Sequence, residues 1–262
     1  MEKVQIGRVI EVYKDSCLIQ ADKTVIRLLL PKKLAIVVGD FIKLDTSKKE
    51  SEILEIKQRT SSLTKTINKK NRVVASNINK VAILASSKPK ISSSLVDKWL
   101  VLSKINNLEA IIIFNKSDRE DFEKIRNDIA LYKSLDIECF EVSTKYGTGI
   151  NSLKISIAKQ SIALVGLSGV GKSSLIRLLT GADIKTQNLS KNTGRHTTTT
   201  TRLYDGPSFS LIDTPGAGDI DLENFNRLQI TSGFHEIFSA TKSCKFTNCS
   251  HASNEQIGRA HV

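Results

Sequence analysis

The sequence predicts an α/β protein in three parts: a small β-barrel, a parallel sheet with helices on both faces, and a short segment with cysteine and histidine. Three observations predict this fold class. The first sixty residues hold five short β-rich runs that turn or charged segments separate. From about residue 78, apolar strand-like runs alternate with amphipathic helical segments. One of these strands enters a glycine-rich loop that opens a helix.

Residues 1–62 are expected to form the barrel. The strand-like runs are VQIGRVIEVY, SCLIQA, TVIRLLL, DFIKLD and SEILEIK, with a turn signal at Gly39-Asp40. The number of strands does not by itself separate an OB-fold from an SH3-like barrel. The polar, basic stretch 59–72 contains few apolar residues, so we expect a linker or an ordered basic loop there.

Residues 63–224 are expected to form the α/β domain. Continuous apolar runs, typical of strands buried on both faces, alternate with segments that carry apolar residues at helical spacing. The expected strands are 78–84, 110–114, 137–142, 161–167 and 209–212, and the expected helices are 94–107, 119–135, 150–160 and 172–180. Residues 225–262 form the third, short part.

The composition fits a folded protein that attracts polyanions. Of the 262 residues, 40% are hydrophobic and 25% charged, which excludes disorder and coiled coil as descriptions of the whole chain. The net charge of +12 favours RNA or DNA, and then anionic lipid, as a partner; the alternative is a lysine-rich codon bias. No apolar run approaches the ~20 residues of a membrane span, and the N-terminus lacks the shape of a signal peptide. We therefore expect a cytosolic protein without a membrane partner.

The most specific motif is a phosphate-binding loop of the form GxxxxGKS between a predicted strand and a predicted helix. Its glycines let the backbone curl so that N–H groups face an anion, and the helix N-terminus adds a dipole. Lys172 is expected to reach the β- and γ-phosphates of a nucleotide, and the Ser173 hydroxyl to ligate Mg²⁺. The loop consists of Gly166, Leu167, Ser168, Gly169, Val170, Gly171, Lys172 and Ser173.

An NKxD motif follows the predicted strand 110–114 and consists of Asn115, Lys116, Ser117 and Asp118. The Asp118 carboxylate can accept from both N1–H and the exocyclic amine of guanine, a donor pair that adenine lacks. Asn115 is expected to tie neighbouring loops together, and the stem of Lys116 to cover the base. The location at the carboxyl end of a parallel strand, where α/β folds bind ligands, favours this interpretation.

Two further strand ends complete the predicted pocket. Ser143-Thr144-Lys145 follows the strand 137–142 and fits a loop whose backbone N–H meets guanine O6, although such short sequences are common. The strand 209–212 leads into Asp213-Thr214-Pro215-Gly216. Asp213 is expected to hold Mg²⁺ through water, and the Gly216 N–H to contact the γ-phosphate.

The threonine-rich segment before that strand is the candidate switch. Thr197 and Thr198 are candidates to complete the Mg²⁺ shell when a γ-phosphate is present, and the later threonines are expected in an edge strand. Ala217 stands where many GTPases carry a water-orienting glutamine, which predicts slow unaided hydrolysis. Besides Lys172, His196 is then the candidate catalytic side chain; the alternative is a surface histidine in a mobile loop.

The motifs occur in a permuted order. Ordinary GTPases present the phosphate loop first, whereas here NKxD at 115–118 and the segment 143–145 precede it. With a barrel before them and a Cys/His knuckle after them, they resemble the ribosome small-subunit-dependent GTPase A family over residues 1–256. The resemblance implies an OB-fold, a circularly permuted P-loop GTPase domain that hydrolyses GTP to GDP, and a role in late maturation of the small ribosomal subunit. The small subunit and its rRNA are then the expected partners of a monomer.

A zinc site is predicted near the C-terminus. Cys244, Cys249 and His251 have zinc-finger-like spacing, but three ligands do not close a structural site. The resemblance implies a fourth ligand, a cysteine, six residues after the histidine, where this chain has Ile257. We therefore expect weak Zn²⁺ binding, or water as the fourth ligand, and a poorly ordered segment from about residue 225.

The last six residues, IGRAHV, match the peptide that a common short-read sequencing adapter encodes in one frame. We therefore hypothesise that the zinc segment is truncated and that the native chain continues with a cysteine and a short helical tail. Recovery of an uninterrupted gene that encodes IGRAHV and then stops would reject this hypothesis.

Two alternative functions stay open. One is a permuted GTPase that acts on the large subunit or another ribonucleoprotein, against which the barrel and the knuckle argue. The other is a nucleotide-gated RNA-binding assembly factor with negligible turnover, which Ala217 keeps open. In each case the barrel has few aromatic residues, chiefly Tyr13 and Phe41, so phosphate contact is expected rather than base stacking.

Overall fold

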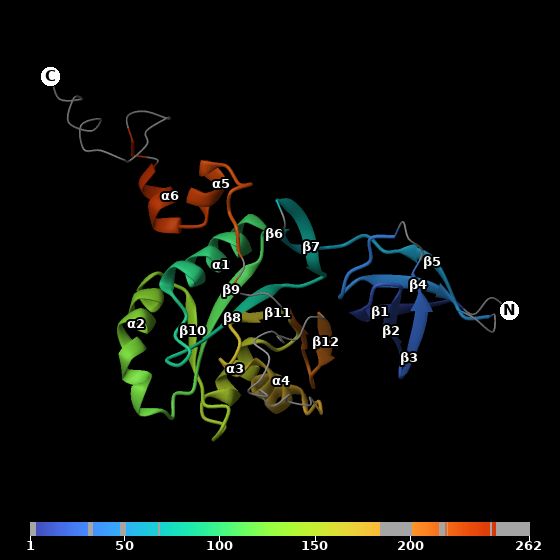
Figure 1. Cartoon of the computed structure of the whole chain (residues 1–262), viewed down its shortest axis with the longest axis horizontal. Helices are drawn as coiled ribbons and strands as arrows, with labels where there is room; N and C mark the ends of the chain where they lie inside the picture. Colours follow the sequence, from blue (N-terminus) through green and yellow to red (C-terminus); the bar gives the residue numbers. More distant parts are fainter. Residues whose placement is uncertain are drawn as a thin grey trace, which may run out of the picture.

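The computed structural model describes residues 4–30, 34–47, 51–67, 69–183, 201–214, 218, 220–241, 243 and 244. Most of its strands join in one long mixed sheet that runs from the α/β domain into the N-terminal strands. Figure 1 shows the N-terminal strands at one end, the α/β domain in the middle and helices α5 and α6 beyond α1.

The five N-terminal strands lie where the sequence predicts them. They are β1 (Val4–Val12), β2 (Ser16–Ala21), β3 (Thr24–Leu29), β4 (Phe41–Asp45) and β5 (Glu52–Ile56). Strand β1 pairs with β2 on one side and β4 on the other, and antiparallel ladders then add β3 and β5. Alternate side chains of these strands, among them Val9, Ile19 and Leu44, form a separate apolar core.

The basic stretch whose composition predicts a linker or loop is largely a β-hairpin. It consists of β6 (Ser62–Ile67) and β7 (Lys70–Ser76). Leu63 and Ala75 face each other across it and are buried in the core of the α/β domain. Both strands contain β-branched residues typical of strands, Thr64, Thr66 and Ile67 in β6 and Val73 and Val74 in β7, a signal that the high lysine content concealed.

An ion pair with a buried carboxylate fixes the joint between the N-terminal strands and this hairpin. Arg59 donates to both carboxylate oxygens of Asp40, at 2.7 and 2.8 Å, and the Ser76 hydroxyl donates to the same carboxylate at 2.7 Å. Asp40 is fully buried, so these donors replace the water that the carboxylate loses on folding.

The α/β domain is built as predicted, with small shifts at the element ends. Its parallel strands are β8 (Lys80–Ser86), β9 (Glu109–Asn115), β10 (Glu138–Glu141), β11 (Ser161–Gly166) and β13 (Ser210–Asp213). The antiparallel strand β12 (Arg202–Asp205) extends the sheet. Strand β12 pairs with β1 as well as β13, so it is not the predicted edge strand, and Thr201, the described threonine of the run, lies just before it. The earlier threonines lie outside the described residues.

Helices cover both faces of the parallel sheet. They are α1 (Ser93–Ile105), α2 (Arg126–Ser134), α3 (Ile150–Ser156) and α4 (Lys172–Thr180), with a 3₁₀ helix, η1 (Glu120–Ile125), before α2. Helices α5 (Arg227–Ser232) and α6 (His235–Thr241) come after the last strand, and α5 packs on α1. No helix within the described ranges is both long and apolar enough to cross a bilayer.

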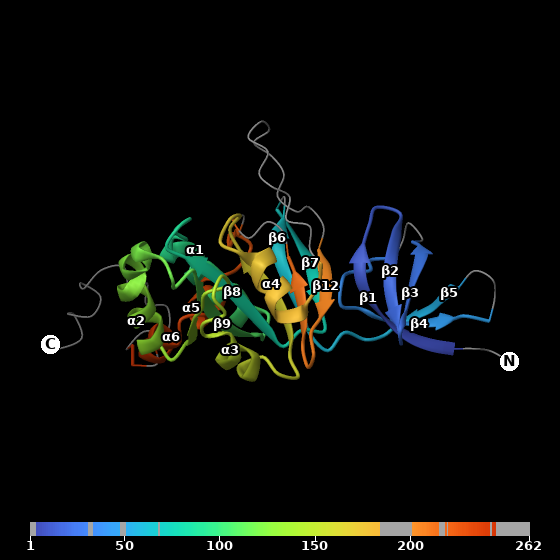
Figure 2. The same cartoon turned by 90° about the horizontal axis from the view of Figure 1, so that it is seen from below.

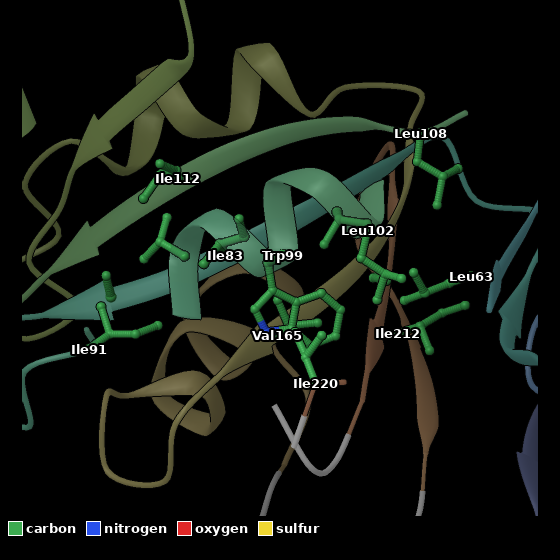
Figure 3. Packing of buried hydrophobic residues seen from close by; sticks show 14 of the residues in the cluster. Leu63, Ile83, Ile91, Trp99, Leu102, Leu108, Ile112, Val165, Ile212 and Ile220 are labelled. Carbon is green, nitrogen blue, oxygen red and sulfur yellow. The ribbon is translucent and has the colours of Figure 1, made fainter. Parts of the chain in front are cut away.

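The two faces bury two apolar clusters. Trp99 and Leu102 of α1 pack against Ile83, Val165 and Ile212 of the sheet (Figure 3). The other face is covered by α3 and α4, whose apolar side chains are Ile150, Leu153, Leu175, Ile176 and Leu179. With both faces closed, a ligand of this domain has to bind at an edge of the sheet.

Candidate nucleotide-binding site

The predicted motifs meet at one edge of the sheet. Because β8, β9, β11 and β13 are parallel, their carboxyl ends lie at the same edge. The register places Ser86 beside Asn115, Leu84 beside Gly166, and Leu164 beside Asp213. The ends of three motif-bearing strands are therefore neighbours in space although the motifs are far apart in the sequence.

Asn115 joins three of the loops at this edge. Its Nδ2 donates to the Val170 carbonyl in the phosphate loop at 2.9 Å, and its Oδ1 accepts from the Thr144 N–H at 3.1 Å. The side chain is fully buried, so both polar ends need these partners. One amide therefore fixes the NKxD loop, the phosphate loop and the loop 143–145 relative to one another.

The Asp118 carboxylate is held from the loop after β10. The Ser143 hydroxyl donates to Asp118 Oδ1 at 2.5 Å and accepts from the Tyr146 N–H at 3.2 Å. Ser143 is buried, whereas Lys145 lies at the surface with its ammonium 4.7 Å from the centre of the Tyr146 ring. The carboxylate thus has a defined direction before any ligand binds.

Lys116 bridges two loops with its ammonium. Nζ donates to the Gly169 carbonyl of the phosphate loop at 2.7 Å and to the Lys88 carbonyl at 2.6 Å. Burial of the side chain, and then the charge of Arg119, lower the pKa of Lys116. The turn after β8, which contains Lys88 and Pro89, is a part of the site that the sequence motifs do not predict. The sequence could have indicated this turn through its location directly after a predicted parallel strand, where α/β folds bind ligands.

The phosphate loop opens helix α4 as its sequence predicts. Gly171 caps the helix at a φ of +105°, and a Cβ at this position would lie 2.3 Å from Asn115 Nδ2. Only glycine satisfies both conditions. Lys172 begins the helix, and its Nζ donates to the Gly166 carbonyl at 3.1 Å, while Ser173 is half-buried in the first helical turn.

Asp213 is the buried carboxylate of the site. It is 7% exposed, and its Oδ1 has no hydrogen-bond partner within the described part of the chain. Burial raises the pKa of Asp213, and the charge of Lys172 partly offsets this. Asp213 lies beside Leu164 of β11, the strand that leads into the predicted phosphate loop, and its unpaired carboxylate oxygen is a ligand that fits Mg²⁺, which prefers oxygen ligands. The next residue, Thr214, is anchored by its hydroxyl to the Leu164 carbonyl at 3.0 Å.

Several predicted residues lie outside the described residues. They are His196, Thr197, Thr198, Gly216, Cys249 and His251, together with Ala217. Cys244 is described and half-buried, and its thiol donates to the Ala240 carbonyl at 4.0 Å. The described ranges contain no group of three His, Cys, Asp or Glu side chains that could hold a metal ion. The zinc site stays a prediction, because two of its three proposed ligands lie outside these ranges.

Comparisons with known proteins agree with this geometry. The RsgA GTPase family model matches residues 56–223. A protein of Haemophilus influenzae strain PittGG named small ribosomal subunit biogenesis GTPase RsgA is 33% identical over 188 residues. The match includes 69% of this chain and 54% of that protein, so the chain spans about half the length of this relative. The protein of the same name from Christiangramia forsetii is 31% identical over 82% of this chain and 73% of its own length.

Two solved structures are similar over nearly the whole chain. YjeQ from Thermotoga maritima superposes with a TM-score of 0.72 at 26% identity, covering 98% of this chain and 91% of that one. YloQ, described as a circularly permuted GTPase, superposes with a TM-score of 0.69 over 97% of this chain and 85% of its own. At 22% identity YloQ supports the fold alone.

Proposed function

The chain belongs to the RsgA GTPase family, and from this premise we propose that it hydrolyses GTP to GDP and phosphate and assists late maturation of the small ribosomal subunit. The single observation that carries the nucleotide part is the Asn115 side chain, which links the NKxD, phosphate and 143–145 loops through two hydrogen bonds. The relatives' names carry the ribosomal part.

In this proposal the base and the phosphates bind to opposite ends of one pocket. Asp118 accepts from guanine N1–H and its exocyclic amine, with Ser117 beside it, and the N–H groups of the loop 143–145 face O6. The stem of Lys116 covers the base. The backbone from Gly166 to Ser173, the N-terminus of α4 and Lys172 surround the phosphates.

Mg²⁺ would be held by the Ser173 hydroxyl and, through water, by Asp213, where it neutralises charge on the β- and γ-phosphates. Thr197 and Thr198 are proposed to join this shell in the GTP state, with the Gly216 N–H at the γ-phosphate. We assign the positioning of the attacking water to His196, since Ala217 cannot do this. Slow turnover is therefore expected without a partner.

The barrel is proposed to be an OB-fold that contacts rRNA through phosphates. Arginines already cover its two prominent aromatic rings: Arg27 lies 5.5 Å from the centre of Tyr13, and Arg8 lies 5.3 Å from that of Phe41. The rings are thus less available for stacking on bases, while the guanidinium groups suit phosphate. The net charge of +12 supports the same type of contact.

Zinc binding by Cys244, Cys249 and His251 remains part of the proposal, with water as the fourth ligand. Because the resemblance places another cysteine six residues after the histidine, we expect this chain to hold Zn²⁺ weakly. A chelator competition titration measures this affinity directly.

GTP turnover measured alone, with small subunits and with large subunits, at several salt concentrations, tests the function. We expect slow turnover alone and marked stimulation by small subunits, which weakens as salt rises. Lys172→Ala is the matched control and should abolish turnover under every condition. Stimulation by large subunits only would favour a factor of the large subunit. Absence of turnover under all conditions would favour a nucleotide-gated RNA-binding factor.

A further inference from the structure

Strand β1 of the barrel runs beside the strands that carry the nucleotide pocket. It pairs antiparallel with β12 at one position, Glu11 opposite Arg202, and β12 pairs antiparallel with β13. Strand β1 therefore runs in the same direction as β13, and Arg202 stands between Glu11 and Asp213 in one cross-strand row. Figure 2 shows the barrel strands directly beyond β12.

Arg8 inserts from the barrel into the opposite ends of the pocket-bearing strands. Its Nη1 donates to the Ser210 hydroxyl at 2.8 Å, and its Nη2 donates to the Ser161 hydroxyl at 2.6 Å and to the Asn77 carbonyl at 3.3 Å. Ser161 begins β11, which ends at the phosphate loop, and Ser210 begins β13, which ends at Asp213. One barrel side chain thus holds the starts of both strands.

Arg8 is a cation with weak acceptors. Its hydrogen-bond partners are neutral, and its Nε is buried without a partner among the described residues. Burial lowers the pKa of Arg8, and the charge of Asp205 partly offsets this. On its other side the guanidinium lies over Phe41, whose side chain is 38% exposed on the outside of the barrel. An RNA phosphate at Phe41 would be a stronger acceptor for Arg8 than two serine hydroxyls.

We propose that Arg8 is a positioning residue with two alternative sets of partners, which are the serines of β11 and β13 or an RNA phosphate. The exchange of the Arg8 guanidinium between these partners couples RNA binding to nucleotide affinity. Release of the serines removes the only restraint that comes from the barrel, among the described residues, at the starts of two short strands, of six and four residues, whose other ends lie at the pocket. Strand β1 pairs with β12 at the single position Glu11–Arg202, where the ion pair measures 3.6 Å, so this strand pairing opposes a small shift of β1 only weakly. This inference rests on the proposed function, because it requires both ligands.

The coupling is measured as the ratio of the Kd of a fluorescent, non-hydrolysable GTP analogue without and with saturating small ribosomal subunits. We expect this ratio to depart from one by about 5-fold or more in the wild-type chain. The Ser161→Ala/Ser210→Ala double variant keeps the barrel unchanged, so it should still bind subunits while the ratio falls to within about 2-fold of one. Arg8→Met should likewise bring the ratio to within about 2-fold of one.

Lys23→Met is the control, since it also removes one cation from the barrel, but from the exposed turn between β2 and β3, on the side of β1 opposite β12. It should keep the wild-type ratio. Thermal melting of each variant checks the fold, and if Arg8→Met does not fold, the serine variant decides. A wild-type ratio in the serine variant overturns the proposal. A ratio of one in the wild-type chain, with both ligands bound, overturns it but leaves the proposed function intact. Failure of the wild-type chain to bind either ligand contradicts the proposed function, and the coupling with it.

Discussion

In the proposed function, two side chains decide which base the pocket selects and help to decide which ion it holds. Asp118 is oriented by Ser143 before any base is present, whereas Asp213 is buried with one oxygen lacking a partner in the described part of the chain. The first arrangement lowers the entropy cost of reading a base. The second opposes folding, because the buried carboxylate loses water without gaining a partner for one oxygen. It also leaves that oxygen available to a cation.

Asp118→Asn should change the preferred base from guanine to xanthine. The amide can donate to the carbonyl oxygen of xanthine but leaves the guanine amine without its acceptor. We expect GDP affinity to fall by about 100-fold, roughly 2.7 kcal/mol, while the affinity for xanthosine diphosphate rises. Competition against a fluorescent nucleotide measures both, and unchanged GDP affinity would refute the assignment of the base site.

Asp213→Asn should stabilise the nucleotide-free protein and weaken Mg²⁺ binding. Because burial raises the pKa of Asp213 in the folded state, the wild-type chain loses stability as the pH rises from the unfolded-state pKa of this carboxyl to its higher folded-state value. The neutral amide removes that loss, by about 1 kcal/mol or ~2–4 °C in Tm at pH 7. Thermal melts from pH 4 to 8 without nucleotide test this, and a lower Tm for the variant at pH 7 would count against it.

At the scale of elements, both ends of α4 have a glycine for the same backbone reason, but only one of the two glycines lies against a residue of the proposed pocket. Gly171 and Gly181 both have positive φ, at the N-terminus and the C-terminus of the helix. A Cβ at Gly171 would meet Asn115, whereas a Cβ at Gly181 would have no atom of the described residues within 4 Å. The two glycines therefore carry the same conformational cost but differ in what surrounds them.

Gly171→Ala should lose nucleotide binding, and Gly181→Ala should keep it. Both variants pay about 1 kcal/mol for a left-handed alanine, but only the first displaces Asn115 and with it three loops. We expect Gly171→Ala to lower nucleotide affinity by at least ~10-fold, with Gly181→Ala within about 2-fold of wild type. Titration of the two purified variants with GDP makes the comparison, and equal affinities would show that the contact with Asn115 is unimportant.

The elements that the sequence predicted are those in which periodicity and turn signals agree. The buried strands such as Ile111–Phe114 are continuously apolar, and α4 has a glycine at each end. The hairpin β6–β7 was missed because Lys65, Lys70 and Arg72 make its local composition resemble that of a linker, although the structure buries Lys65. The turn at Lys88 was missed because its role comes from a contact with Lys116, which is far away in the sequence.

At the scale of the whole molecule, the permuted order of the motifs does not prevent them from meeting in one place. Parallel strands bring their carboxyl ends to one edge whatever the order in which the chain visits them. The permutation does decide which elements adjoin the pocket: β13 leads on to α5 and α6, and β12 pairs with the barrel. The sequence predicts the shared edge, but not the pairing of β1 with β12, which is a tertiary contact without a local pattern.

The central claim is that the NKxD loop and the phosphate loop bind the same nucleotide. Calorimetric titration of Asp118→Asn and of Asp118→Asn/Lys172→Ala with xanthosine diphosphate tests it most directly. Melting curves first confirm that both variants fold. We predict one equivalent bound by the single variant and an affinity at least ~100-fold lower in the double variant, because the base and the phosphates of one molecule span both loops. Equal affinities in the two variants would contradict the claim, since Lys172 would then serve a different ligand from the one that Asp118 reads.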